Sequence, residues 1–121
     1  MKITNYRELI VWQKAMELTK KIYSLTKDFP KEEIYGLTSQ MRRAAVSIPS
    51  NIAEGQARSG TKEFAHFLSI ASGSKAELET QLLICVDIGY LSETDIKAVM
   101  DLSDEVGKMF TALRSKLTTN H

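Results

Sequence analysis

The sequence predicts an all-α protein, folded as an antiparallel up-down-up-down four-helix bundle in a single domain, residues 1–121. Apolar residues recur at steps of three and four along most of the chain, and no alternation typical of β-strands persists. Only 2 prolines and 6 glycines are present, so long helices with short connections are expected. Such connections place consecutive helices beside one another in opposite directions.

The first helix is expected over residues 7–29. Its apolar stripe alternates steps of four and three and consists of Val11, Ala15, Leu18, Ile22, Leu25 and Phe29, widened on one side by Trp12, Met16 and Tyr23. Pro30 ends this helix because a proline disfavours helical geometry in the residue before it. A short connection follows, with a turn expected at Gly36 and an N-cap at Thr38.

The second helix is expected over residues 38–58, where the helical pattern contains Pro49. Its apolar stripe passes through the proline without losing phase and consists of Leu37, Met41, Ala44, Ala45, Ile48 and Ile52. A proline inside a helix removes one backbone hydrogen bond and clashes with the carbonyl four residues earlier, that of Ala45, at a cost of about 3 kcal/mol. We therefore expect a kinked helix rather than a broken one.

The third and fourth helices are expected over residues 62–88 and 93–117. Gly89 suits the left-handed position that follows a helix C-terminus, and Ser92 with Asp95 has the spacing of a capping box. The buried positions expected in the third helix are Phe64, Phe67, Leu68, Ala71, Leu78, Leu82 and Cys85. Those expected in the fourth helix are Ile96, Val99, Met100, Ser103, Val106, Phe110, Leu113 and Leu117.

No signature of an enzyme or of a metal site emerges from the sequence. Cys85 is the single cysteine and falls on the apolar stripe of the third helix, where a buried, inert thiol is the common case. Glu63 and His66 form one Glu-x-x-His motif, whereas di-iron bundles need two such motifs and two further glutamates. We expect no catalytic residue, no metal and no cofactor. Because no apolar run is long enough to span a bilayer, we expect no membrane association and a cytoplasmic location.

Charge is segregated along the chain, although the formal net charge is only +1. Residues 1–62 contain 11 Lys or Arg against 6 Asp or Glu, residues 63–107 contain 2 against 9, and residues 108–121 contain 3 against none. A basic segment suits a polyanion and an acidic one suits a complementary protein, but oppositely charged helices lying side by side produce the same pattern. The basic candidates for nucleic-acid binding are Lys14, Lys20, Lys21, Lys27, Arg42, Arg43 and Arg58.

The second helix carries a further face of polar and small residues. Steps of four, four, three and four align Arg43, Ser47, Asn51, Glu54 and Arg58, with Ser50 beside them. Glu54 and Arg58 have the spacing of an ion pair. Subunit packing, phosphate binding by the arginines and a solvated face all fit this pattern, and no aromatic residues for base stacking are interleaved with it. The candidates for a subunit interface are Ser47, Ser50, Asn51, Glu54 and Gly55.

Four stretches of the sequence resemble the family of bacterial four-helix-bundle proteins named after the intervening sequences of 23S rRNA. They are ELIVWQKAMELTKKIY, FPKEEIYGLTSQMRRAAVSIPSNIAEG, KEFAHFLSIASGSKAELETQL and GYLSE, and the resemblance covers residues 6–117. The combination of SIPSNIAEG with ELETQL makes the resemblance specific. The hallmark positions that match are Ser50, Asn51, Glu54, Gly55, Glu77 and Glu79.

The resemblance implies a homopentamer around a central channel, with no catalytic activity and with RNA as the expected ligand. The family is similar in fold to the accessory variability determinant protein of diversity-generating retroelements, a pentameric barrel that binds nucleic acid and a reverse transcriptase. We therefore expect a non-enzymatic, oligomeric RNA-binding or ribonucleoprotein accessory factor. The alternative is an oligomeric scaffold that recruits a protein partner through the acidic segment 63–107 without binding nucleic acid. The chain departs from the basic relative in being nearly neutral.

Overall fold

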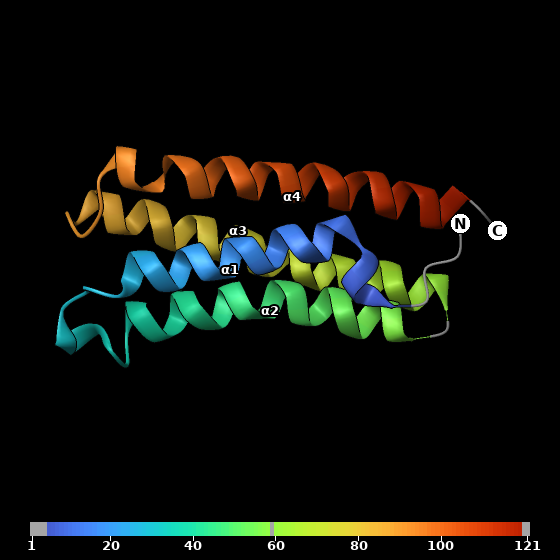
Figure 1. Ribbon diagram of the computed structural model, residues 1–121, viewed down its shortest axis with the longest axis horizontal. Coiled ribbons are helices and arrows are strands. Elements are labelled where there is room, and N and C mark those ends of the chain that lie inside the picture. Colours follow the sequence, from blue (N-terminus) through green and yellow to red (C-terminus); the bar gives the residue numbers. More distant parts are fainter. Residues whose placement is uncertain (1–4, 59, 120–121) are drawn as a thin grey trace.

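The computed structural model describes residues 5–58 and 60–119, and within these ranges every regular element is helical. The elements are η1 (Tyr6–Glu8), α1 (Ile10–Thr26), η2 (Lys31–Glu33), α2 (Leu37–Ala57), α3 (Thr61–Asp87) and α4 (Glu93–Thr119), where η denotes a short 3-10 helix. The four α-helices lie side by side along one long axis (Figure 1). The α1–α2 and α3–α4 connections lie at one end, and the α2–α3 connection lies at the other. The described part of the chain is thus an all-helical four-helix bundle, as predicted.

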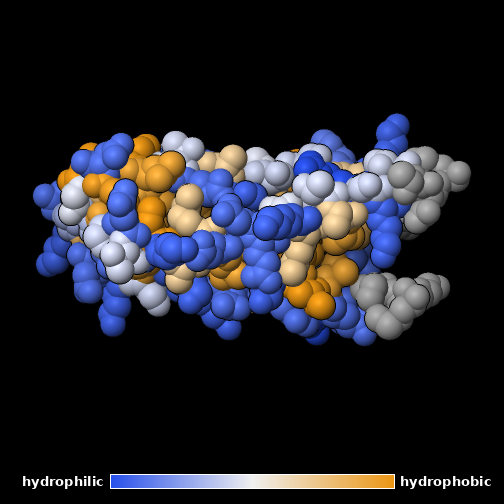
Figure 2. All heavy atoms as spheres, turned by 90° about the horizontal axis from the view of Figure 1, so that it is seen from above, coloured by the Kyte–Doolittle hydropathy of each residue, from blue (hydrophilic) through white to orange (hydrophobic). Residues whose placement is uncertain are grey.

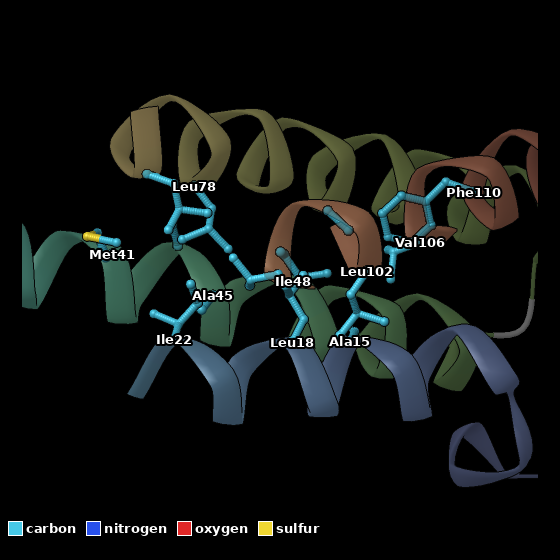
Figure 3. Packing of buried hydrophobic residues seen from close by; sticks show 14 of the residues in the cluster. Ala15, Leu18, Ile22, Met41, Ala45, Ile48, Leu78, Leu102, Val106 and Phe110 are labelled. Atoms are coloured by element: carbon cyan, nitrogen blue, oxygen red, sulfur yellow. The ribbon is translucent and has the colours of Figure 1, made fainter. Parts of the chain in front are cut away.

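The core runs along the whole bundle and takes side chains from every helix. Figure 3 shows Leu18 of α1, Ile48 of α2, Leu78 of α3 and Phe110 of α4 pointing into the same interior, and all four are fully buried. The predicted apolar stripes supply nearly all of this core, so helical periodicity located the buried faces correctly. Leu102 of α4 is an addition that the predicted stripe had left out.

The first helix is shorter than predicted: α1 covers residues 10–26, whereas residues 7–29 were expected. Asn5 starts the separate turn η1 by a capping box: its side chain accepts the Arg7 N–H at 2.9 Å, while its own N–H donates to the Glu8 carboxylate at 3.3 Å. Leu9 is then extended, with φ −75° and ψ 125°, so α1 begins only at Ile10. Local side-chain capping therefore overrides the apolar periodicity at this end.

Glu33, and not Thr38, caps the start of α2. The Glu33 carboxylate accepts the Leu37 N–H at 3.0 Å, while Thr38 already lies inside the first turn. Gly36 occupies the N-cap position, where an added Cβ would lie 2.6 Å from the Glu33 carboxylate. The expected N-cap at Thr38 was wrong because a carboxylate from the preceding turn satisfies the backbone group that Thr38 would have served.

The α3–α4 connection follows the predicted capping rules. Gly89 has φ 87°, and the N–H groups of Tyr90 and Gly89 donate to the carbonyls of Cys85 and Val86 at 2.9 and 3.1 Å. These two bonds define the Schellman motif. Ser92 and Asp95 then exchange backbone-to-side-chain hydrogen bonds of 2.9 and 3.0 Å, which confirms the capping box.

A glycine in α4 makes room for an ion pair on α3. Lys75 and Glu79 pair at 2.9 Å, with side chains only 15% and 21% exposed. Ser103 of α4 donates its hydroxyl to the same Glu79 carboxylate. At Gly107, an added Cβ would lie 3.0 Å from the Lys75 side chain, so this position favours a residue without one. The hydrogen bond from Ser103 therefore links α4 to a shielded ion pair of α3, whose carboxylate is the hallmark residue Glu79.

Pro49 lies within α2, which continues unbroken from Leu37 to Ala57. Because proline has no N–H, the Ala45 carbonyl lacks its partner within the helix, and Ala45 is fully buried. The Thr19 hydroxyl of α1 lies 3.0 Å from that carbonyl and 2.9 Å from the Ala15 carbonyl of its own helix. Its single proton is shared between the two oxygens, so α1 satisfies the carbonyl that Pro49 leaves unpaired.

We expect Thr19→Val to destabilise the protein by about 1–3 kcal/mol, the cost of a buried carbonyl left without a donor. In a Pro49→Ala background the residue 49 N–H returns, so Thr19→Val should cost clearly less. Chemical denaturation of the four proteins measures this coupling.

Thr80→Val is the matched control, because the Thr80 hydroxyl makes the same bond within its helix, to the Ala76 carbonyl at 2.9 Å, on an exposed face. It should change stability by no more than about 0.5 kcal/mol. Equal costs of Thr19→Val in both backgrounds would contradict this account.

Candidate nucleic-acid interface

A groove of about 770 Å³ lies beside α2 at its boundary with α1. Its lining residues come from α1, from the connection after η2, and from the first half of α2. They are Tyr23, Ile34, Thr38, Ser39, Arg42, Arg43, Val46 and Ser47. The groove thus brings two of the seven predicted basic residues together with an aromatic ring, exposed aliphatic side chains and several hydroxyls.

Arg42 is held in place by two contacts with α1. Its Nε donates to the Thr26 hydroxyl oxygen at 3.0 Å, and its guanidinium carbon lies 4.6 Å from the centroid of the Tyr23 ring. The Thr26 hydroxyl itself donates to the Ile22 carbonyl at 2.8 Å, which leaves its oxygen free to accept from Arg42. A guanidinium over an aromatic ring is attracted by the negative face of the ring. Arg42 is therefore oriented before any ligand arrives.

Arg43 is exposed and makes no hydrogen bond or ion pair with any residue that the structure describes. It lines the groove and also a smaller hollow of about 290 Å³ between α2 and α3, opposite Glu77. Because consecutive residues of a helix point about 100° apart, Arg42 stays against α1 while Arg43 reaches outward. One arginine of the pair is fixed and the other is available.

Thr38 contributes a hydroxyl with no hydrogen-bond partner among the described residues, although its side chain is buried. An unsatisfied buried hydroxyl costs about 1–3 kcal/mol and calls for an explanation. Thr38 lines the groove, but its hydroxyl oxygen is buried and does not face the opening beside Arg42 and Arg43.

The other predicted basic residues lie elsewhere and are partly neutralised. Lys14 pairs with Glu105 of α4 at 3.4 Å. Arg58 pairs with Glu54 at 3.0 Å, as its spacing predicted, and with Glu63 at 3.4 Å. Lys20 and Lys21 line a different groove between α1 and α4, together with Glu17 and Asp95, and Lys27 is exposed. Within one chain, the seven basic residues therefore do not form one continuous surface.

Three of the five predicted interface residues make hydrogen bonds or close contacts within this chain. The hydroxyls of Ser47 and Ser74 bond at 2.9 Å across α2 and α3, and the Asn51 amide donates to the Ser47 carbonyl and hydroxyl at 2.8 and 2.9 Å. Gly55 is buried, and an added Cβ would lie 2.6 Å from the Phe67 Cβ. The structure thus places Ser47 and Gly55 in the packing of α2 on α3, and Asn51 holds the Ser47 hydroxyl within α2. Ser50 and Glu54 remain exposed.

No aromatic residue is interleaved with the arginines in the sequence, but the fold brings one to Arg42. Tyr23 precedes Arg42 by 19 residues, and only the packing of α1 on α2 brings the ring beneath the guanidinium. Tyr35, which is 95% exposed, directly follows the groove residue Ile34. The sequence feature that could have indicated this contact is the position of Tyr23 beside the apolar stripe of the first helix, on the side that faces α2.

The environments of Cys85 and His66 can now be compared with the sequence-based expectations. Burial, and to a lesser extent the charge of Glu33, raise the pKa of the Cys85 thiol to about 11, and its sulfur lies 3.6 Å from the Met41 sulfur. His66 is exposed, and the described residues contain no cluster of three or more possible metal ligands. In the described ranges, no helix is both long and apolar enough to cross a bilayer.

Glu33 joins η2 to the α3–α4 connection at the end of the groove. Its carboxylate accepts the Leu37 N–H at 3.0 Å and the Tyr90 hydroxyl at 2.9 Å. The Leu37 bond, followed by the Tyr90 bond, lowers the pKa of Glu33 below its ordinary value of 4.5. This carboxylate therefore positions the chain from which Ile34 and Thr38 enter the groove.

A lowered folded-state pKa means that the ionised Glu33 stabilises the fold above about pH 4.5, and that this contribution is lost as the pH falls through the lowered pKa. We expect Glu33→Gln to have a lower Tm than the wild type at pH 6, with the gap narrowing toward pH 3. Thermal unfolding at several pH values measures this difference in Tm. The other carboxylates are the same in both proteins, so their effects cancel in the difference. A gap that stays constant with pH would contradict the assignment.

Comparison with known proteins identifies the family and supports the fold. A model of the 23S rRNA-intervening sequence protein family matches residues 7–112. A crystal structure of a protein of unknown function from the S23 ribosomal protein family of Bacteroides thetaiotaomicron VPI-5482 has a similar fold, with a TM-score of 0.77 and 21% identity over 87% of this chain and 98% of that chain. No curated protein matches. The chain belongs to the 23S rRNA-intervening sequence protein family.

Proposed function

We propose that this protein is a non-enzymatic RNA-binding or ribonucleoprotein accessory factor, and that the groove beside α2 contacts the RNA. The observation that carries the proposal is the pair Arg42 and Arg43 at one groove, with Tyr23 beneath the first guanidinium. Phosphate contacts need exposed cations, and RNA-binding surfaces add aromatic rings that stack on unpaired bases. The family name, which refers to an intervening sequence of 23S rRNA, agrees with an RNA ligand.

A single groove offers few cations, so we propose that assembly supplies the affinity. The chain has a formal net charge of +1, and Lys14 and Arg58 are already paired with carboxylates. Several copies of a weak site on one particle bind a long polyanion far more tightly than one copy does. A homopentameric ring of antiparallel up-down-up-down bundles would provide five such grooves.

The outer face of α3 is the surface that best supports such an assembly. Leu83, Ile84 and the C-cap residue Ile88 are 51%, 41% and 52% exposed and lie together at the C-terminal end of α3, while Ile70 is 40% exposed nearer its start. Figure 2 shows apolar residues gathered at this end of the bundle, with a second apolar patch toward the opposite end. Contiguous exposed apolar residues often mark contacts between proteins. Ser50, which lines a hollow between α1 and α2, and the exposed Glu54 remain separate candidates for a subunit contact.

The alternative function is a scaffold that recruits a protein partner through the acidic segment 63–107. The exposed Leu83, Ile84 and Ile88 lie in that segment, so the same apolar surface could receive another protein. The likeness in fold to the accessory variability determinant protein stays a prediction.

We expect Arg43→Ala to weaken the binding of an unstructured single-stranded RNA and to flatten its salt dependence. Loss of one phosphate contact lowers the slope of log affinity against log salt by about 0.7. Fluorescence anisotropy across a salt series measures this slope. Lys108→Ala is the matched control, because Lys108 is an exposed cation on α4, away from the groove. Equal slopes for both variants would contradict the assignment of Arg43.

We expect Ile84→Glu to disrupt assembly without reducing helicity, because it buries a charge in an apolar contact between subunits. Native mass spectrometry should give the mass of five chains for the wild type and smaller species for the variant. Thr111→Glu adds the same charge at an exposed position of α4 away from these apolar residues, and it should leave the assembly intact. A wild-type monomer would contradict both the ring and the gain in affinity from multiple grooves.

A further inference from the structure

The arginine of the Tyr23–Arg42 pair is held in a fixed position at an open surface. Its Nε donates to the Thr26 hydroxyl oxygen at 3.0 Å, and its guanidinium carbon lies over the Tyr23 ring, 4.6 Å from the ring centroid. The Nη groups make no hydrogen bond or ion pair with the described residues. The pair therefore carries a charged plane that is ordered in advance and still has unused donors.

The groove around this pair has the size and composition of a site for a small planar ligand. Its volume of about 770 Å³ lies within the range of ligand sites, about 300–1,000 Å³. Ile34 and Val46 line it and are 51% and 41% exposed, so two aliphatic side chains are available to cover a ring. The hydroxyl of Ser39 supplies a polar partner, whereas that of Thr38 is buried beneath the groove.

Arg43 adds an anion contact beside this apolar site. It lines the same groove, it is exposed, and it points away from Arg42 by one helical step. A ligand with a flat ring and a neighbouring phosphate would therefore meet Arg42 with the ring and Arg43 with the phosphate. A nucleotide has this chemistry, and arginine planes and tyrosine rings are the groups on which unpaired RNA bases stack.

A base within a duplex does not fit this arrangement. Its two faces are covered by neighbouring base pairs, and the major groove of A-form RNA is too deep and narrow for side chains to reach the base edges. A duplex could contact Arg43 only through its phosphates, which would leave Tyr23, Ile34 and Val46 unused. The geometry favours a nucleotide that is unpaired or turned out of its helix.

Building on the proposed RNA-binding function, we infer that the groove takes one unpaired nucleotide of the RNA, its base stacked on the Tyr23–Arg42 pair and its phosphate bound by Arg43. Tyr23 and Arg42 thereby select single-stranded over double-stranded RNA. Arg43 supplies charge to either form.

The experiment compares three probes with the full-length protein: a single-stranded RNA that contains 2-aminopurine, the same sequence as a duplex, and inorganic polyphosphate, which has no bases. Tyr23→Leu should weaken single-strand binding about tenfold, since stacking of one base is worth about that much. It should also abolish the quenching of 2-aminopurine. Tyr23→Phe keeps the ring, so it should retain quenching and stay within about twofold of the wild type.

Polyphosphate separates the base contact from the charge contact. Tyr23→Leu should leave polyphosphate binding unchanged, whereas Arg43→Ala should weaken it. Circular dichroism verifies that each variant is folded, and Tyr23 is 44% exposed, so its replacement perturbs the core little.

Two results would overturn the inference in distinguishable ways. If the wild type binds single strand and duplex equally, and Tyr23→Leu changes neither, the base contact is refuted while the proposed RNA-binding function stands. If the wild type binds no RNA in either form, the proposed function falls and the base contact falls with it.

Discussion

The contact between the Thr19 hydroxyl and the Ala45 carbonyl determines how α1 lies against α2. Pro49 leaves that carbonyl without an N–H inside its own helix, so α1 must approach closely enough to supply a donor. Four residues further along α1 is Tyr23, and three residues back along α2 is Arg42. The two side chains are therefore brought together one helical turn away, with the guanidinium carbon 4.6 Å from the ring centroid.

The same contact accounts for the position of the groove. Thr26 lies one more turn along α1 and accepts the Arg42 Nε at 3.0 Å, so α1 holds this arginine at two points. Pro49 lies two helical turns from Arg42 and affects the groove indirectly. It frees the Ala45 carbonyl, which binds the Thr19 hydroxyl and so positions α1 against α2. Its buried ring also belongs to the interior of the bundle.

The other side of α2 is constrained by close packing on α3. Gly55 lies against Phe67, and the bonded hydroxyls of Ser47 and Ser74 bridge the two helices at 2.9 Å. These contacts require small or hydroxyl-bearing residues, because a larger side chain would separate the helices. The part of the polar and small face of α2 formed by Ser47, Asn51 and Gly55 is therefore used in packing within the chain, whereas Arg43, Ser50, Glu54 and Arg58 remain exposed.

The helices could be predicted from the sequence because each one repeats a local pattern many times. The capping box at Ser92 and the turn at Gly89 were also predicted, since both depend on residues adjacent in the sequence. The ends of α1 and the cap of α2 were missed. The start of α1 depends on the side chain of Asn5, which caps a separate turn, and the start of α2 depends on the side chain of Glu33.

The candidate site was predicted only in part, for a related physical reason. Arg42 and Arg43 were identified by their charge, which is a property of single residues. Their different environments follow from the packing of α1 on α2, because one arginine faces Tyr23 and the other faces outward. The neutralisation of Lys14 by Glu105 of α4 likewise joins residues 91 positions apart, so a count of charges along the chain does not reveal it.

These environments bear on how a nearly neutral chain could recognise RNA. An exposed arginine gains affinity for any phosphate, but that gain decreases with salt and carries no preference among RNA structures. A guanidinium already fixed on a tyrosine loses little conformational entropy on binding, and its flat face favours a planar partner. Since paired charges such as Lys14 and Arg58 contribute little field, recognition by the groove would depend on the ordered Tyr23–Arg42 surface more than on total charge. A chain of low net charge is compatible with selective RNA binding on these terms.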